Sequence, residues 1–427
     1  MSSRTRILSA LAIAVGMLIL SYWVTNLNTI ISGETALMRK VELVHGYFKP
    51  HINPMADSVL LINVAYDRQN VLAKDKMGLP AGYDYITDRQ KLHELLKELK
   101  HKDDSLYREE HRHFYKYILL DVLFDNTTRT PQDSALFTLI ASMKRIVIPR
   151  DTGTRLADTC LNDKAGLVNY YTNYKFVSFA KYPYLIDGKK SLPLKMYEEV
   201  TGHTITDHGF FANDGWRLAR KSIVLPFVLR CDSAYTQDGM KVWHNMGMDL
   251  LGSAYSYNGD TTTGDRELHD NPELTQGKYI IIGAFSGGDM HYSYLENQPG
   301  PAILFNAYLS LLHGHHRVSL FVALLLLAAF FIMAWSILNG QTIDALLFDT
   351  ITRRKTGKAN AALTALLRVL AVVVSWVGYS MFLSLLCIFT YLVLGEVYDI
   401  FITATVFQLI SIMVVRINRR KNKKRHA

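Results

Sequence analysis

Long apolar windows alternate with ordinary globular sequence along this chain, and the alternation predicts how it is organised. About 20 apolar residues are needed to cross a hydrocarbon core of about 30 Å. Four windows hold no Asp, Glu, Lys or Arg: Ile7–Leu27, Val318–Leu338, Val369–Leu394 and Ile400–Val415. The first three reach or approach that length, and the fourth, with 16 residues, reaches it if Val397 and Tyr398 lie in the interface. The pattern predicts four transmembrane helices.

Residues 28–317, between the first two windows, have the pattern of an α/β domain. Short aliphatic and β-branched runs predict buried strands at Ser58–Asp67, Lys116–Asp125, Arg145–Arg150 and Tyr279–Ile282. Helical patterns follow at Ile86–Lys100, Thr130–Lys144, Leu192–Gly202 and Pro301–His313. Alternating strands and helices imply right-handed crossovers and a mainly parallel sheet. The Tyr- and Phe-rich sequence within Gly166–Leu229 predicts an antiparallel portion.

The distribution of charge predicts the orientation of the chain in a membrane. The formal net charge is +9, but the excess of Lys and Arg lies before residue 7, in residues 339–368 and in residues 416–427. Because basic residues favour the cytoplasmic side, these three segments are predicted to be cytoplasmic, and the nearly neutral residues 28–317 to lie outside. Basic residues beside membrane helices point to the lipid bilayer as their partner, and no nucleic acid is expected.

The expected layout is a transmembrane anchor at 1–27, an extracytoplasmic domain at 28–317, a three-helix membrane region at 318–415 and a basic tail at 416–427. The first window also has a signal-peptide alternative, since Arg4 and Arg6 precede it. Its apolar run is longer than a typical signal-peptide core, and no A-x-A-like cleavage site follows, which favours a retained anchor.

A glycine-rich loop after the last predicted strand raises the question of a nucleotide site. Gly283 and Gly288 have the spacing of a phosphate-binding loop. Asp289 and Met290, however, stand where that motif requires Lys and Ser or Thr, and a carboxylate there would repel phosphate. The glycines are therefore expected to allow a tight turn, and no cofactor is expected.

Acidic residues at the ends of the predicted strands are the candidates for ligand binding. In parallel α/β sheets, ligands bind outside the carboxyl ends of the strands. The candidates are Asp67, Asp121, Asp125 and Asp289, with the nearby His291. If the strands are neighbours, these groups could converge on a cation, an amine or a polyhydroxyl ligand. The alternative is that they cap helices and loops, as acidic residues commonly do.

No residue pattern predicts an enzyme or a metal centre. The chain has neither a G-x-S-x-G elbow nor an H-E-x-x-H helix. The histidines of His313–His316 lack a metal-ligand pattern. Cys160 and Cys231 both fall in the extracytoplasmic domain, where an oxidising compartment would permit a disulfide, but the sequence leaves their separation open.

Several segments together resemble the bacterial sensory domain CHASE type 2, which is associated with cyclases and histidine kinases. They are VLLINV, ITDRQKLHELLKEL, ILLDVLFD with DSALFTLIA, YPYLIDGKKSLPLKMYEEVTG, and a final strand followed by Gly283, Asp289, Pro299-Gly300, Asn306-Ala307 and Leu311-Leu312-x-Gly314. Two departures from the family are the ending of the first strand, Asn63-Val-Ala-Tyr-Asp67, and the insertion at Lys100–His113. Family members carry an output domain after the last span, whereas this chain ends twelve residues past Val415.

The resemblance implies a non-enzymatic sensor in the bacterial inner membrane. It would bind an unknown small ligand or protein outside and signal to a separate cytoplasmic or membrane output protein, with a homodimer as one option. The alternative is a structural or assembly subunit of a cell-envelope complex, in which the extracytoplasmic domain serves as a docking surface.

Overall fold

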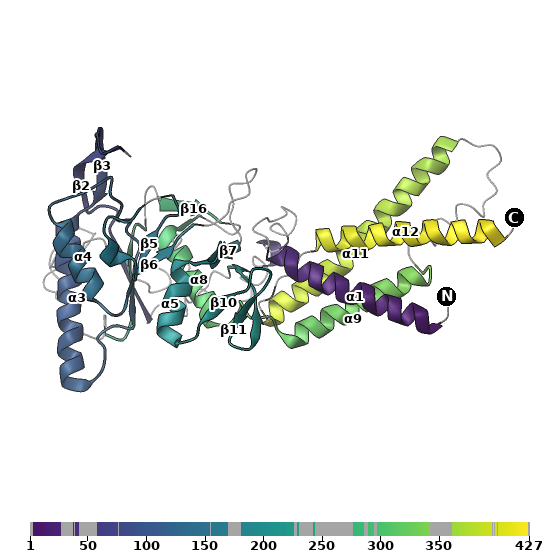
Figure 1. Cartoon of the computed structure of the whole chain (residues 1–427), viewed down its shortest axis with the longest axis horizontal. Coiled ribbons are helices and arrows are strands. Elements are labelled where there is room, and N and C mark those ends of the chain that lie inside the picture. The colour runs from purple at the N-terminus through teal and green to yellow at the C-terminus, as the bar shows by residue number, and fades with distance from the viewer. Residues whose placement is uncertain are drawn as a thin grey trace. The chain divides into compact units, whose positions relative to one another are not determined.

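A computed structural model of the chain describes residues 3–26, 37, 39–41, 58–75, 77–153, 155–169, 181–225, 229, 242–243, 276–285, 289–293, 297–341, 361–394, 396, 398 and 400–425. It contains two compact units (Figure 1). The helical unit comprises Met1–Val41, Arg217–Arg220 and Arg317–Ala427, and the α/β unit comprises Glu42–Trp216 and Lys221–His316.

A six-stranded sheet forms the centre of the α/β unit. Its order is β14 (Val242–Trp243), β1 (Val59–Asn63), β15 (Tyr279–Gly283), β4 (Tyr117–Leu120), β5 (Ile146–Arg150) and β6 (Ala165–Leu167). All five neighbouring pairs are parallel, which confirms the predicted parallel sheet. The last of these strands in the chain, β15, lies between β1 and β4, so the ends of three strands that are far apart in sequence lie side by side.

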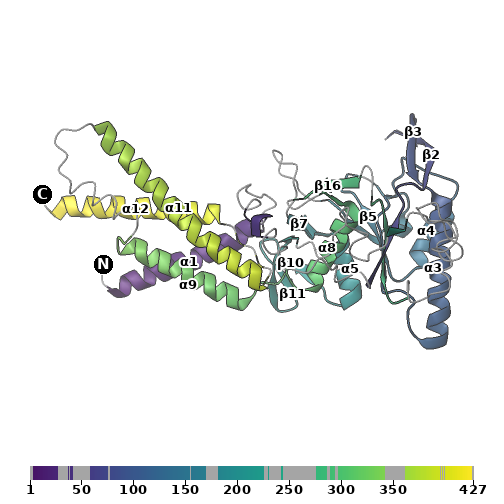
Figure 2. The same ribbon diagram turned by 180° about the vertical axis from the view of Figure 1, so that it is seen from behind.

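Helices cover both faces of this sheet. Figures 1 and 2 show α3 (Arg89–Glu110) and α4 (Asp133–Ser142) on one side, and α5 (Leu192–Thr201) and α8 (Gly300–Leu312) on the other. Ile280 and Ile282 pack in one core with residues of α3 and α4, whereas the fully buried Ile281 alternates to the opposite face. Burial on both faces explains why these strands read as continuous apolar runs.

Short antiparallel pairs complete the α/β unit. They are β7 (Lys181–Pro183) with β13 (Ser222–Val224), β8 (Leu185–Ile186) with β9 (Lys189–Lys190), β10 (Ile205–Asp207) with β11 (Ala212–Asp214), and β16 (Met290–Tyr292) with β17 (Asn297–Pro299). The first three fall within Gly166–Leu229 and confirm the predicted antiparallel portion.

One antiparallel hairpin was not predicted from the sequence. It is formed by β2 (Arg68–Lys74) and β3 (Pro80–Thr87), between β1 and α3. The predicted helix from Ile86 was therefore too early, because Ile86 and Thr87 end β3. Helix α3 begins after Asp88, whose side chain accepts hydrogen bonds from the backbone N–H groups of Gln90 and Lys91 at 3.0 Å.

Within the helical unit, the prediction of four membrane spans is wrong. Three helices among the described residues are long and apolar enough to cross a membrane: Ser3–Thr25 (α1), Leu320–Leu338 (α9), and Val369–Val393 within α11 (Ala361–Leu394). The fourth window lies in α12 (Phe401–Arg425), but the apolar part of that helix is the shorter stretch Phe401–Ile417. That stretch is shorter than the about 20 apolar residues that a membrane span needs.

A buried ion pair holds the segment Arg217–Arg220 within the helical unit. The side chains of Arg220 and Glu396 are 5% and 4% exposed and form a salt bridge. Glu396 Oε1 also accepts a hydrogen bond from the backbone N–H of Ser319 at 3.0 Å, just before α9. Tyr398 donates its hydroxyl to Glu396 and lies 4.7 Å from the Arg220 guanidinium. This segment is thereby fixed to the start of α9 and to the connection between α11 and α12.

Candidate functional site

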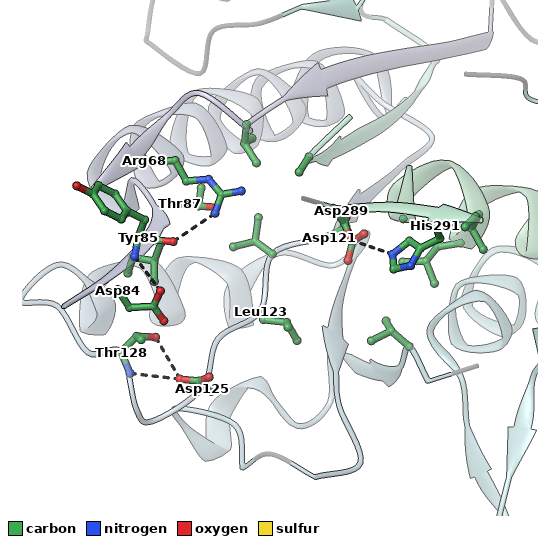
Figure 3. A pocket seen from close by; sticks show the side chains of 18 of the residues that line it. Arg68, Asp84, Tyr85, Thr87, Asp121, Leu123, Asp125, Thr128, Asp289 and His291 are labelled. Carbon is green, nitrogen blue, oxygen red and sulfur yellow. Dashed lines mark hydrogen bonds and ion pairs between the residues drawn. The ribbon is translucent and has the colours of Figure 1, made fainter. Parts of the chain in front are cut away.

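A cavity of about 420 Å³ lies beside the carboxyl ends of β1, β15 and β4 in the α/β unit. Figure 3 shows it from close by. Its lining residues come from the loops after these strands, from the β2–β3 hairpin, from the start of α3 and from the first turns of α8. This is where parallel α/β sheets bind ligands, because the loops after neighbouring strands meet there.

Four of the five residues predicted for a site line this cavity: Asp121, Asp125, Asp289 and His291. These residues are far apart in the chain, but the strand order brings them together, because β15 lies directly beside β4. The backbone N–H of Asp121 donates to the carbonyl of Ile282 at 2.7 Å, which fixes Asp121 to the end of β15.

Asp121 and Asp289 form an acidic pair on one side of the cavity. Asp289 Oδ1 lies 3.0 Å from His291 Nε2. Removal from water and the neighbouring charge of Asp289 together raise the pKa of the Asp121 carboxyl well above its usual value. Among the described residues, no donor forms a hydrogen bond with the Asp121 carboxyl group, so its oxygens remain open to a ligand.

Two glycines make room for this acidic pair. A β-carbon at Gly300 would lie 2.6 Å from Asp289 Oδ2. A β-carbon at Gly283 would lie 2.3 Å from Pro301 Cγ and 3.1 Å from Asp121 Cβ. A larger residue at either position would therefore collide with neighbouring side chains, and at Gly283 also with the first turn of α8.

The other two predicted acids have roles as structural partners. Asp67 is absent from the cavity lining, and its Oδ1 accepts a hydrogen bond from Lys91 Nζ at 2.8 Å. Asp125 lines the cavity, but its Oδ1 accepts hydrogen bonds from the backbone and hydroxyl groups of Thr127 and Thr128. The strands end earlier than predicted, at Asn63 and Leu120, so both acids lie in loops.

The hairpin adds charged residues that the sequence reasoning missed. Arg68 and Asp84 both line the cavity, and Arg68 donates from Nη1 to the carbonyl of Tyr85 at 3.2 Å. The alternating pattern of β2 and β3 around a Gly- and Pro-containing connection is the signal that could have revealed this hairpin.

Arg89, at the start of α3, is a second missed residue of the cavity lining. Its side chain is 2% exposed, and its Nη2 donates to the carbonyl of Leu123 at 3.1 Å. Asp133 Oδ1 lies 3.7 Å from its Nε. Burial lowers the pKa of Arg89 to about 10, although Asp133 and Asp125 act in the opposite direction. The guanidinium remains a cation at neutral pH.

Neither a metal centre nor the proposed disulfide can be built from the described residues. No group of three His, Cys, Asp or Glu side chains within them is arranged to hold a metal ion. Cys160 is exposed, and Cys231 lies outside the described residues, so the Cys160–Cys231 pair is still only a prediction.

Comparison with known proteins adds no relative: no family model, no curated protein and no solved structure matches this chain. The class of the protein follows from its own fold and site. It combines a parallel α/β unit, which has a charged cavity at the carboxyl edge of its sheet, with long apolar helices compatible with a membrane.

Proposed function

We propose that the protein is a bacterial inner-membrane sensor of the CHASE type 2 kind, whose α/β unit binds a small ligand outside the membrane. The observation that carries this proposal is the cavity, which joins loops from three neighbouring strands to the β2–β3 hairpin. A concave site in which placed polar and charged groups accompany apolar side chains is typical of a site that selects a small ligand. The chain would then signal through its helices to a separate output protein.

The proposed orientation has the N-terminus and residues 339–368 in the cytoplasm and the α/β unit outside. The excess of basic residues in the two cytoplasmic segments supports it. Single cysteines introduced at Ser3, Asp104 and Gly357 and probed with a membrane-impermeant maleimide test it, in a background where native cysteines are replaced. Labelling of intact cells is expected only at position 104, and labelling at position 3 or 357 would refute the orientation.

The proposed relay uses two of the places where the chain passes between the units. One is the connection from α8 to α9, and the other is the segment Arg217–Arg220. The Arg220–Glu396 ion pair supports a role for the second connection, because it fixes that segment to the helices. Movement of the α/β unit would thus be carried to the start of α9 and to the connection between α11 and α12.

A thermal-shift screen of the full-length protein in detergent tests ligand sensing. The compounds are amino acids, amines, sugars, nucleosides and divalent cations, measured on the wild-type chain and on Asp289→Asn. A concentration-dependent shift that the substitution removes supports the proposal. No shift with any class, together with a co-purifying envelope protein, would instead favour a structural or assembly subunit.

A further inference from the structure

The cavity is lined by charged groups of both signs. Figure 3 shows Arg68 on one side, where Asp84 and Asp125 also lie, and Asp121 with Asp289 on the other. The Arg68 side chain points across the cavity toward Asp121 and Asp289. Arg68 is held in place because Nε donates to the carbonyl of Ala65 at 3.3 Å and Nη1 to that of Tyr85 at 3.2 Å. A ligand between the two sides would therefore meet a positioned cation and a pair of carboxyl groups.

Arg89 provides an independent indication of an anionic ligand group. Its side chain is 2% exposed and lines the cavity, yet its Nη1 has no hydrogen-bond partner among the described residues. A buried donor without an acceptor is unfavourable, and the penalty is greater for a charged group. A carboxylate that entered the cavity beside Arg89 would supply the missing acceptor after a small shift of the guanidinium.

The acidic side offers the complementary chemistry. Asp289 uses one oxygen for His291, and the Asp121 carboxyl accepts no hydrogen bond from the described residues. An ammonium group has three donors and no acceptor, so it suits two adjacent carboxyl groups. The cavity lining also includes apolar residues, among them Val122, Ile303 and Leu304.

We propose that the ligand is a small zwitterion of the amino-acid or short-peptide class, and this rests on the proposed sensing function. Its carboxylate lies toward Arg68 and Arg89, and its ammonium group lies toward Asp121 and Asp289. The volume of about 420 Å³ is within the range of small-molecule sites. The bound zwitterion joins the β2–β3 hairpin to the end of the sheet.

The test compares matched ligands on the full-length protein in detergent by isothermal titration calorimetry. The individual standard L-amino acids and dialanine are measured first. The tightest-binding amino acid is then compared with its deaminated acid and its decarboxylated amine; for leucine these are 4-methylpentanoate and 3-methylbutylamine. Removing either charged group is expected to weaken binding by about tenfold or more, since a charged hydrogen bond is lost.

Two substitutions test which cavity residues bind each charged end of the ligand. Arg68→Gln should weaken binding of the amino acid about tenfold but leave the affinity for the amine unchanged. Asp289→Asn should weaken binding of the amino acid similarly but leave the affinity for the deaminated acid unchanged. Arg112→Gln and Asp104→Asn are the matched controls, because these residues pair with Glu110 and Lys100 outside the cavity lining.

The possible results separate the ligand class from the function. If an amine, a sugar, a nucleoside or a divalent cation binds in an Asp289-dependent manner while zwitterions do not, the ligand class is wrong and ligand sensing stands. Equal binding of the amino acid and its decarboxylated amine likewise refutes the zwitterion. If no compound of any class binds, both the ligand class and the proposed function fail.

Discussion

Breaking the Arg220–Glu396 pair should destabilise the helical unit far more than an exposed ion pair would. Both side chains are at most 5% exposed, so Arg220→Met leaves the Glu396 carboxylate buried without its cation. Removing one partner of a buried pair typically costs about 3–5 kcal/mol. Glu396→Leu should cost at least as much, because it also removes the acceptor for the Ser319 backbone N–H and the Tyr398 hydroxyl.

The double variant Arg220→Met/Glu396→Leu tests whether the unpaired buried charge causes the loss of stability. It leaves no unpaired charge, so its main loss is the acceptor for the Ser319 backbone N–H and for the Tyr398 hydroxyl, about 1–3 kcal/mol for each. The free energy of unfolding is measured by guanidinium titration in detergent micelles, with Arg112→Met as the control. That exposed pair with Glu110 should contribute no more than about 1 kcal/mol. A double variant as destabilised as the sum of the single variants would refute the buried-charge argument.

Three further predictions concern the α/β unit. Asp121→Asn should raise the unfolding temperature at pH 7. Because the pKa of Asp121 is raised in the native state, the folded protein favours the protonated carboxyl group. The stability that this protonated group contributes is lost as pH rises from the ordinary pKa of about 3.9 through the raised pKa of the folded state. The difference between the variant and wild type should grow from pH 4 to pH 8 in fluorimetry. Gly300→Ala should weaken ligand binding about tenfold in calorimetry, because its β-carbon would displace the Asp289 carboxylate. Asn306→Ala should lower the free energy of unfolding by about 2–5 kcal/mol in guanidinium titration. It removes the side chain that forms hydrogen bonds with the buried N–H and C=O of Leu229.

Matched controls exist for each of these changes. Asp104→Asn neutralises an exposed acid and should leave the pH dependence of unfolding as in wild type. Gly153→Ala places a β-carbon in open space and should leave ligand affinity unchanged. Asn297 is exposed, and Asn297→Ala should change unfolding by less than about 0.5 kcal/mol. Equal effects of any variant and its control would contradict the corresponding explanation.

The parallel sheet could be predicted from sequence because its strands are buried on both faces and read as apolar runs. Strand order could not be predicted, since nothing local in β15 indicates that it inserts between β1 and β4. The acids Asp121 and Asp289 were nevertheless identified, because the carboxyl ends of parallel strands share one edge. Asp67 was included for the same reason, but it accepts a hydrogen bond from Lys91 in the first turn of α3.

The basic side of the cavity was missed because it depends on a non-local arrangement. Arg68 is the first residue of the hairpin and Arg89 follows the hairpin in sequence. A charged residue at either position is indistinguishable in the sequence from one on a solvated surface. Arg89 also begins an amphipathic helix, where an arginine is ordinarily exposed. Only the packing of α3 against the loop after β4 buries it, beside Phe124 and the carbonyl of Leu123.

The placement of Arg68 on the hairpin gives the proposed ligand a physical means of signalling. A ligand shifts a conformational equilibrium only by its difference in affinity for the two states. A zwitterion joined to Arg68 and to the Asp121–Asp289 pair makes both contacts only while the hairpin lies against the end of the sheet. Two charged hydrogen-bonding contacts contribute about 1.5–3 kcal/mol each, and a shift from 1:99 to 99:1 needs about 5.5 kcal/mol. The two contacts are thus of the right size to change a weakly populated hairpin position into the dominant one.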